Sequence, residues 1–226
     1  MQFREALAIH FHDIVQISRD EIFGISDVKC APINLPIDTG TMFAGYVGRL
    51  YEPGKGLLLL AINPGGGGDK YTKRTPEDEI FFPLLIDFKF TKGTGVQKAF
   101  ERVNESFVPI VKRWNLWRIL EPTLEAAGKT IEDVAYMNVV PYRTRGDTMP
   151  PTTARNTAWR LVVEPTLSIL NPEAVITLGK KAGGVVEKLY AGDRHLYCVP
   201  RTIGDSWISE EALAVHEQMR RELHDA

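Results

Sequence analysis

The chain has 226 residues, of which 44% are hydrophobic and 25% are charged, and we expect residues 1–226 to form a single domain. Lys and Arg number 27 against 29 Asp and Glu, which gives a net charge of −2. This balance argues against a strong non-specific hold on nucleic acid, although a local basic face is compatible with it.

Two features of the composition exclude whole classes of protein. The two cysteines, Cys30 and Cys198, lie far apart, so the chain alone cannot supply a thiolate zinc site or an iron–sulfur cluster. Charged residues interrupt the apolar N-terminal segment, and no apolar run approaches the ~20 residues that span a bilayer. We therefore expect a cytoplasmic monomer without a membrane segment, a metal or another cofactor.

Hydrophobic patterning predicts the secondary structure in chain order. Helical spacing of apolar residues predicts helices over 3–17, 95–112, 116–127, 152–170, 180–190 and 210–224. Pro165 is expected to kink the fourth of these helices. Short apolar runs predict buried strands at 56–62, 134–140, 174–178 and 195–199, and residues 42–51 are compatible with a further strand. The alternation predicts a three-layer α/β/α sandwich around a central, mainly parallel four-stranded sheet.

The first buried strand ends in an unusual turn. Asn63 and Pro64 follow the run of leucines, and four glycines, Gly65 to Gly68, come next. The turn lies at the carboxyl edge of the predicted sheet, where open α/β sheets bind ligands, and glycines allow close approach of the backbone. Asn63 alone would be interpreted as an ordinary Asn-Pro turn, and the glycines are equally compatible with a surface loop.

Two further strands end in similar polar sequences. The strand at 134–140 contains Asn138 and continues into Pro141-Tyr142-Arg143, and the strand at 195–199 continues into Pro200-Arg201-Thr202. Because parallel strands share one carboxyl edge, these segments are expected to gather at the same edge as Asn63.

In this order, the motifs resemble the uracil-DNA glycosylase superfamily. Ile62-Asn63-Pro64-Gly65 is similar to the first motif of its mismatch-specific and single-strand-selective branches, and Met137 to Arg143 is similar to its middle strand. Asn171 to Ala182 resembles the next strand and helix start, and Val199 to Thr202 falls at the second catalytic motif. The resemblance covers about residues 56–207.

The resemblance implies a hydrolase that removes a deaminated or modified base from DNA, with single-stranded and mismatched DNA as candidate substrates. Asn63 would hold the attacking water and Asp69 would polarise it, whereas Asn138 would read the base and Phe82, or failing that Phe81, would stack on it. Substrate contacts would also come from Ile62, Pro64, Gly65, Gly66, Arg201 and Thr202, and DNA backbone contacts from Lys70, Arg143, Lys180 and Lys181.

Other interpretations of these residues remain open. Family members carry His-Pro-Ser or Pro-Ser where this chain has Pro200-Arg201-Thr202. A non-cleaving protein that binds a nucleotide or nucleic acid, or a hydrolase of a free nucleoside or nucleotide, is therefore an alternative. Phe81 and Phe82 are also compatible with core packing, Asn138 with a structural role, and Asp69 and the basic residues with ordinary surface charge.

Overall fold

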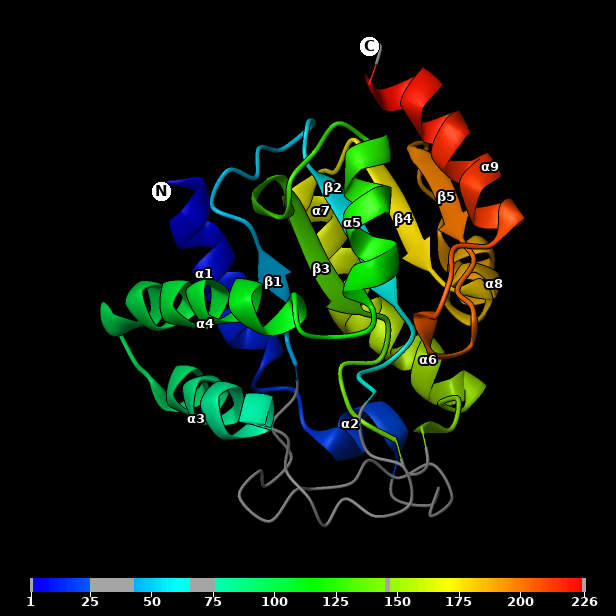
Figure 1. Ribbon diagram of the computed structural model, residues 1–226. Helices are drawn as coiled ribbons and strands as arrows, with labels where there is room; N and C mark the ends of the chain where they lie inside the picture. Colours follow the sequence, from blue (N-terminus) through cyan, green and yellow to red (C-terminus); the bar gives the residue numbers. More distant parts are fainter. Residues whose placement is uncertain (1, 25–42, 66–75, 145–146, 225–226) are drawn as a thin grey trace. The chain divides into compact units, whose positions relative to one another are not determined.

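The computed structural model describes residues 2–24, 43–65, 76–144 and 147–224. Strands and helices alternate through these ranges (Figure 1), which confirms the predicted α/β class. Asp69, Lys70, Gly66 and Cys30 lie outside the described residues.

The strands form one five-stranded sheet in the order β1-β3-β2-β4-β5. They are β1 (Tyr46–Val47), β2 (Leu57–Ala61), β3 (Val134–Asn138), β4 (Ala174–Leu178) and β5 (His195–Val199). β4 pairs in parallel with β2, where Leu57 lies opposite Ala174, and with β5, where Ala174 lies opposite His195. The four strands predicted from apolar runs are therefore present, and each is shorter than or equal to its predicted length.

The prediction of four strands needs correction at one edge. The backbone N–H groups of Gly48 and Leu50 donate to the carbonyl oxygens of Val134 and Glu132, so this segment runs antiparallel to β3 and the sheet is mixed. A Cβ at position 48 would lie 2.2 Å from the Glu132 oxygen, so only glycine permits this approach.

The helices agree with the predicted ranges to within a few residues, with two additions. They are α1 (Phe3–Ile14), α2 (Arg19–Phe23), α3 (Pro76–Phe90), α4 (Gly95–Val111), α5 (Trp117–Ala126), α6 (Thr152–Ala158), α7 (Glu164–Leu170), α8 (Lys180–Leu189) and α9 (Glu210–Met219). A π-turn at Trp159–Val163 connects α6 to α7. Pro165 has no N–H to donate to residue 161 inside this turn, which explains the local departure from α geometry.

The described residues divide into two compact units that are interleaved in the sequence. The first comprises Met1–Tyr46, Ile62–Phe107 and Met137–Ile169, and the second comprises Val47–Ala61, Val108–Tyr136 and Leu170–Ala226. The prediction of a single domain stays a prediction.

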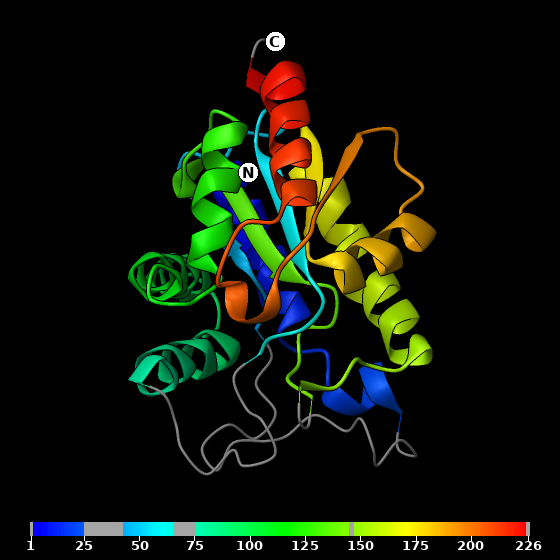
Figure 2. The same cartoon turned by 45° about the vertical axis from the view of Figure 1, so that its right-hand side comes forward.

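The second unit is built around completely buried strands. Leu57, Leu58, Leu59 and Leu60 of β2 have no exposed surface, and burying each leucine contributes roughly 1.5–3 kcal/mol. Helices α5 and α9 cover one face of these strands and α8 covers the other (Figure 2).

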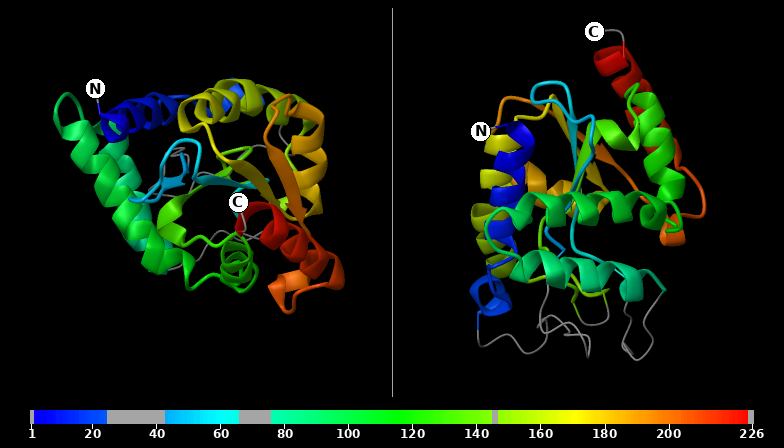
Figure 3. Two further views of the ribbon diagram at one scale, coloured as in Figure 1. Left: turned by 90° about the horizontal axis from the view of Figure 1, so that it is seen from above. Right: turned by 90° about the vertical axis from the view of Figure 1, so that its left-hand side faces the viewer.

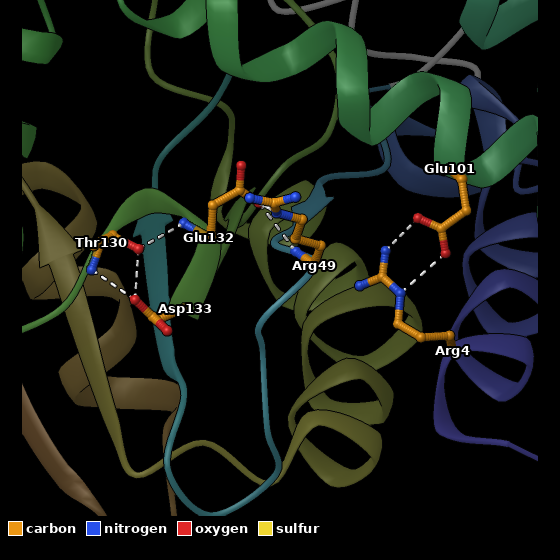
Figure 4. A network of polar contacts seen from close by, with 6 residues as sticks. All are labelled: Arg4, Arg49, Glu101, Thr130, Glu132 and Asp133. Atoms are coloured by element: carbon orange, nitrogen blue, oxygen red, sulfur yellow. Dashed lines mark hydrogen bonds and ion pairs between the residues drawn. The ribbon is translucent and has the colours of Figure 1, made fainter.

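The first unit is mainly helical. Arg4 of α1 and Glu101 of α4 point toward each other (Figure 4), and Arg4 Nε donates to Glu101 Oε1 at 3.0 Å. Helix α3 lies beside α4 (Figure 3), where the rings of Phe88 and Phe100 are 5.8 Å apart. Helix α3 begins at Pro76, in a part of the chain where hydrophobic patterning predicted no helix.

None of the helices in the described ranges has both the length and the apolar character that a bilayer-crossing helix needs.

A buried histidine connects α9 to α5 in the second unit. The Thr123 hydroxyl donates to the Ile119 carbonyl oxygen at 2.6 Å, so it accepts a hydrogen bond from His216 Nε2 at 3.0 Å. His216 is 1% exposed, and its Nδ1 is buried without a hydrogen-bond partner in the described part of the chain. Burial, together with the nearby charge of Arg220, lowers the pKa of His216.

We predict that the free energy of unfolding decreases as the pH falls below about 6.5, the ordinary histidine pKa. The unfolded chain binds the His216 proton more readily than the folded protein, so stability is present above this pH and is lost below it. Denaturant unfolding between about pH 7.5 and 5.5 should show a smaller decrease for His216→Gln than for the wild type. An identical decrease in both proteins would contradict this role of His216.

Candidate functional site in the first unit

The exits of β2 and β3 lie side by side. The Ile62 carbonyl oxygen accepts a hydrogen bond of 2.9 Å from the Val140 N–H, just beyond the end of each strand. The turn at Asn63 and the segment after Asn138 therefore start from neighbouring positions, as the parallel pattern predicts.

Asn63 is oriented by a threonine that follows β3. Asn63 Nδ2 donates to Thr144 Oγ1 at 3.0 Å and approaches the Pro64 carbonyl oxygen at 3.5 Å. Thr144 is fully buried, and its hydroxyl donates to the Thr148 carbonyl oxygen, which leaves the Thr144 oxygen as an acceptor for Asn63. The amide of Asn63 is thus held through its nitrogen, and its Oδ1 makes no hydrogen bond to any described residue.

Asn138, the last residue of β3, has an unusual buried oxygen. The residue is 1% exposed, and its Oδ1 has no hydrogen-bond partner among the described residues. Buried polar atoms are almost always hydrogen-bonded, because an unsatisfied one costs about 1–3 kcal/mol. The oxygen is therefore a candidate acceptor for a donor that a ligand brings.

The two candidate aromatic residues differ in their surroundings. Phe81 is 7% exposed and its ring packs 5.6 Å from Phe43 and 6.2 Å from Phe107, so it belongs to the core. Phe82 is half-buried, and the guanidinium carbon of Arg143 lies 5.2 Å from the centroid of its ring. Phe82 is thus the aromatic residue that remains a candidate for stacking.

The other predicted residues of the first motif have simpler environments. Ile62 and Pro64 are half-buried and Gly65 is exposed, whereas Gly66, Asp69 and Lys70 lie outside the described residues.

In the described part of the chain, no group of three or more His, Cys, Asp or Glu side chains is arranged to hold a metal ion.

The second unit contains Arg201, which is paired within its own loop. Arg201 Nε and Nη2 donate to the two carboxylate oxygens of Asp205 at 2.8 and 2.5 Å, and Asp205 is 3% exposed. Burial disfavours the charged guanidinium, but the hydrogen bonds and the charge of Asp205 outweigh it, and the pKa of Arg201 is raised. Burial also raises the pKa of Tyr136 to about 12, although the Arg201 charge acts in the opposite direction.

An open groove of about 580 Å³ adjoins this loop in the second unit. Its walls include Lys180, Arg201, Thr202 and Trp207, and Lys180 Nζ pairs with Glu211 Oε2 at 2.6 Å. The Thr202 hydroxyl donates to the Trp207 carbonyl oxygen at 2.7 Å, and Lys181 is exposed. The two cationic side chains that line the groove, Lys180 and Arg201, are therefore each paired with a carboxylate of the same unit.

The sequence alone did not single out two residues that orient the candidate side chains Asn63 and Arg201. Thr144 orients Asn63 from 81 positions away, and no local pattern indicates such a contact. Asp205 lies four residues after Arg201, a spacing that offered a weak signal for an ion pair.

No protein-family model matches the chain, and no curated protein is similar enough to serve as a relative.

We predict that Thr144→Val lowers the free energy of unfolding by about 1–3 kcal/mol, because it leaves the Asn63 amide and the Thr148 carbonyl without their partner. Thr144→Ser is the matched control, since it keeps the hydroxyl and removes one methyl group worth about 0.8 kcal/mol. A Thr144→Val variant as stable as the wild type, measured by denaturant unfolding, would show that the hydrogen bonds of Thr144 contribute nothing.

Arg201→Ala should destabilise the protein by about 1–3 kcal/mol, because the buried carboxylate of Asp205 loses two charged hydrogen bonds, which water can replace only in part. The double variant Arg201→Ala/Asp205→Asn removes that charge and should recover part of the loss. Asparagine also tolerates the left-handed backbone at position 205, where φ is 51°. A double variant whose loss equals the sum of the single losses would contradict this account.

Proposed function

We propose that this protein is a DNA glycosylase-like hydrolase that removes a deaminated or modified base, of the uracil type, from DNA. The observation that carries the proposal is the buried Oδ1 of Asn138, which has no hydrogen-bond partner in the described ranges. Sequence resemblance across four motifs, together with the side-by-side exits of β2 and β3, supports the same conclusion.

The Asn138 oxygen suits a base that carries a ring N–H. Uracil presents an imide N–H and hypoxanthine a lactam N–H, and each would donate to a carbonyl oxygen. Cytosine has no N–H at the corresponding ring nitrogen, so the same oxygen would reject the undamaged base. Removing a base from the DNA stack costs a few kcal/mol. Stacking of that base on Phe82 would offset part of this cost.

Asn63 would position the attacking water. A carboxamide has no useful proton affinity, so Asn63 cannot be a general base. Its Oδ1, which bonds to no described residue, can accept a hydrogen bond from water. As the N-glycosidic bond breaks, the sugar gains oxocarbenium character and the base leaves as an anion. A water that is already oriented then adds to the anomeric carbon and releases a proton to solvent, and solvent protonates the departed base anion. Thr144 keeps the amide in that orientation.

As the sequence resemblance implies, the fold would be a uracil-DNA glycosylase-like sandwich. The protein would act on DNA as a cytoplasmic monomer without a cofactor. Arg143, Lys180 and Lys181 would contact the DNA backbone, and Thr202 would contact the substrate.

A second candidate is a protein that binds a nucleotide or nucleic acid without cleavage. The Arg201–Asp205 pair favours it, because an arginine whose two nitrogens are bound by a buried carboxylate has less capacity to stabilise a departing base anion. A hydrolase of free nucleosides or nucleotides would carry the same Asn63 and Asn138 chemistry.

The test is single-turnover base excision from oligonucleotides that contain uracil, hypoxanthine, xanthine or a mismatch. Asn63→Ala should slow excision by about 10²–10³-fold, since it removes a preorganised contact to the attacking water. Asn156→Ala, at an exposed position of α6 in the same unit, is the matched control and should excise at the wild-type rate.

The outcomes separate the candidates. Excision that is lost only in Asn63→Ala supports the glycosylase. Binding of the same oligonucleotides without excision supports the non-cleaving alternative, and hydrolysis of deoxyuridine or deoxyinosine alone supports the free-nucleoside enzyme.

A further inference from the structure

Residues 200–209 form the loop that connects β5 to α9 in the second unit (Figure 2). Two large apolar side chains of this loop face solvent, since Ile203 is 91% exposed and Trp207 is 62% exposed. Leu213 of α9 is 47% exposed and lies three residues after Glu210, so the two share one face of the helix. Single exposed apolar residues are ordinary, but a group of them beside a groove is typical of a surface that binds another molecule.

Internal bonds hold the loop in this exposed conformation. The Thr202 hydroxyl donates to the Trp207 carbonyl oxygen at 2.7 Å, and Arg201 pairs with the buried carboxylate of Asp205. Ile203 lies between the two ends of each of these bridges in the sequence. Because the loop is already ordered, a partner that binds to it does not have to order it, which lowers the entropic cost of binding.

The groove beside the loop has room for a short peptide segment. Its volume of about 580 Å³ is within the range of about 300–1,000 Å³ that is typical of small-ligand sites. Trp207 lines the groove, whereas Ile203 and Leu213 do not. A small molecule in the groove would leave those two side chains exposed. A peptide could fill the groove with one side chain and cover both of them with its neighbours.

The charges around the groove favour a basic partner. Each of the two cations that line it, Lys180 and Arg201, is paired with a carboxylate. Glu210 also lines the groove and is exposed, and its carboxylate forms no ion pair with any residue in the described ranges. An incoming phosphate would find only cations that already have partners. A lysine or arginine would find the Glu210 carboxylate and the face of the Trp207 ring.

We infer that this groove docks a short segment of a partner protein, in which a basic residue stands beside apolar residues. The basic side chain would lie over Trp207 next to Glu210, and the apolar residues would cover Ile203 and Leu213. The inference goes beyond the proposed function and does not depend on it, because these residues belong to the second unit and Asn138 belongs to the first.

The test begins with a display library of random dodecapeptides, from which binders to the full chain are selected. The enriched peptides should contain more Lys and Arg than Asp and Glu, with a basic residue next to an apolar one. Enriched peptides are then synthesised with a fluorophore, and their affinity is measured by fluorescence anisotropy. The affinity should fall as the salt concentration rises, because the contact with Glu210 is exposed.

Trp207→Ala should weaken peptide binding by at least about tenfold, because aromatic residues at the centre of an interface contribute most of its affinity. The hydrogen bonds between Trp207 and Thr202 use the backbone of Trp207, so the variant keeps them. Leu50→Ala is the matched control, since it truncates an exposed leucine of the same unit outside the groove, and it should bind the peptides as the wild type does.

Glu210→Gln tests the charge separately from the apolar contact. It should weaken binding of the basic peptides roughly two to five times, as expected for an exposed ion pair. Glu187→Gln, which removes an exposed carboxylate of α8 outside the groove, is its control and should leave their affinity unchanged.

Each other outcome would overturn the inference. A selection that enriches no peptide, enriched peptides without an excess of basic residues, or peptides that bind Trp207→Ala as tightly as the wild type would each do so. A single-stranded oligonucleotide whose binding is weakened by Trp207→Ala, with no loss of peptide binding, would show that the surface contacts DNA instead. All of these results leave the proposed function to the excision assay, which is measured on Asn63→Ala.

Discussion

The complete burial of the central strands limits where polar chemistry can lie. Leu57 to Leu60 of β2 and the first three residues of β4 have no exposed surface, so a polar side chain there must find its partner inside the protein. Thr177 of β4 does so, because its hydroxyl donates to the Tyr197 carbonyl oxygen at 3.3 Å. Asn138 of β3 does not, since its Oδ1 lacks a partner in the described residues. This contrast is the reason for assigning a ligand-binding role to Asn138 rather than a structural one.

The polar residues beyond the strand ends are held in two different ways. Thr144 holds Asn63 by its nitrogen, which leaves a carbonyl oxygen available for water. Asp205 binds Arg201 by two nitrogens and neutralises its charge. The first arrangement orients the amide of Asn63, and the second stabilises a loop. Arg201 therefore serves its own loop, and most of the proposed chemistry falls to the first unit.

The sequence predicted the elements that depend on local pattern. Strands with continuous apolar runs and helices with regular apolar spacing, such as 95–112 and 180–190, were found close to their predicted ranges. Helix α3 was missed because Pro83 lies inside it and its apolar residues lack a clear helical face. The edge strand β1 was predicted too long, because its pairing depends on the approach of Gly48 to Glu132. The contacts of Asn63 with Thr144 and of Phe82 with Arg143 join distant segments, and only the folded chain determines them.

The central claim is that the buried oxygen of Asn138 accepts a hydrogen bond from a ring N–H of the base. The most direct measurement compares the binding of uracil with 3-methyluracil, and of hypoxanthine with 1-methylhypoxanthine, to the wild-type protein. In each pair, methylation replaces the N–H donor with a methyl group. The account predicts that methylation weakens binding by at least about tenfold, because the oxygen stays unpaired. Equal affinities for the methylated and unmethylated bases would contradict it.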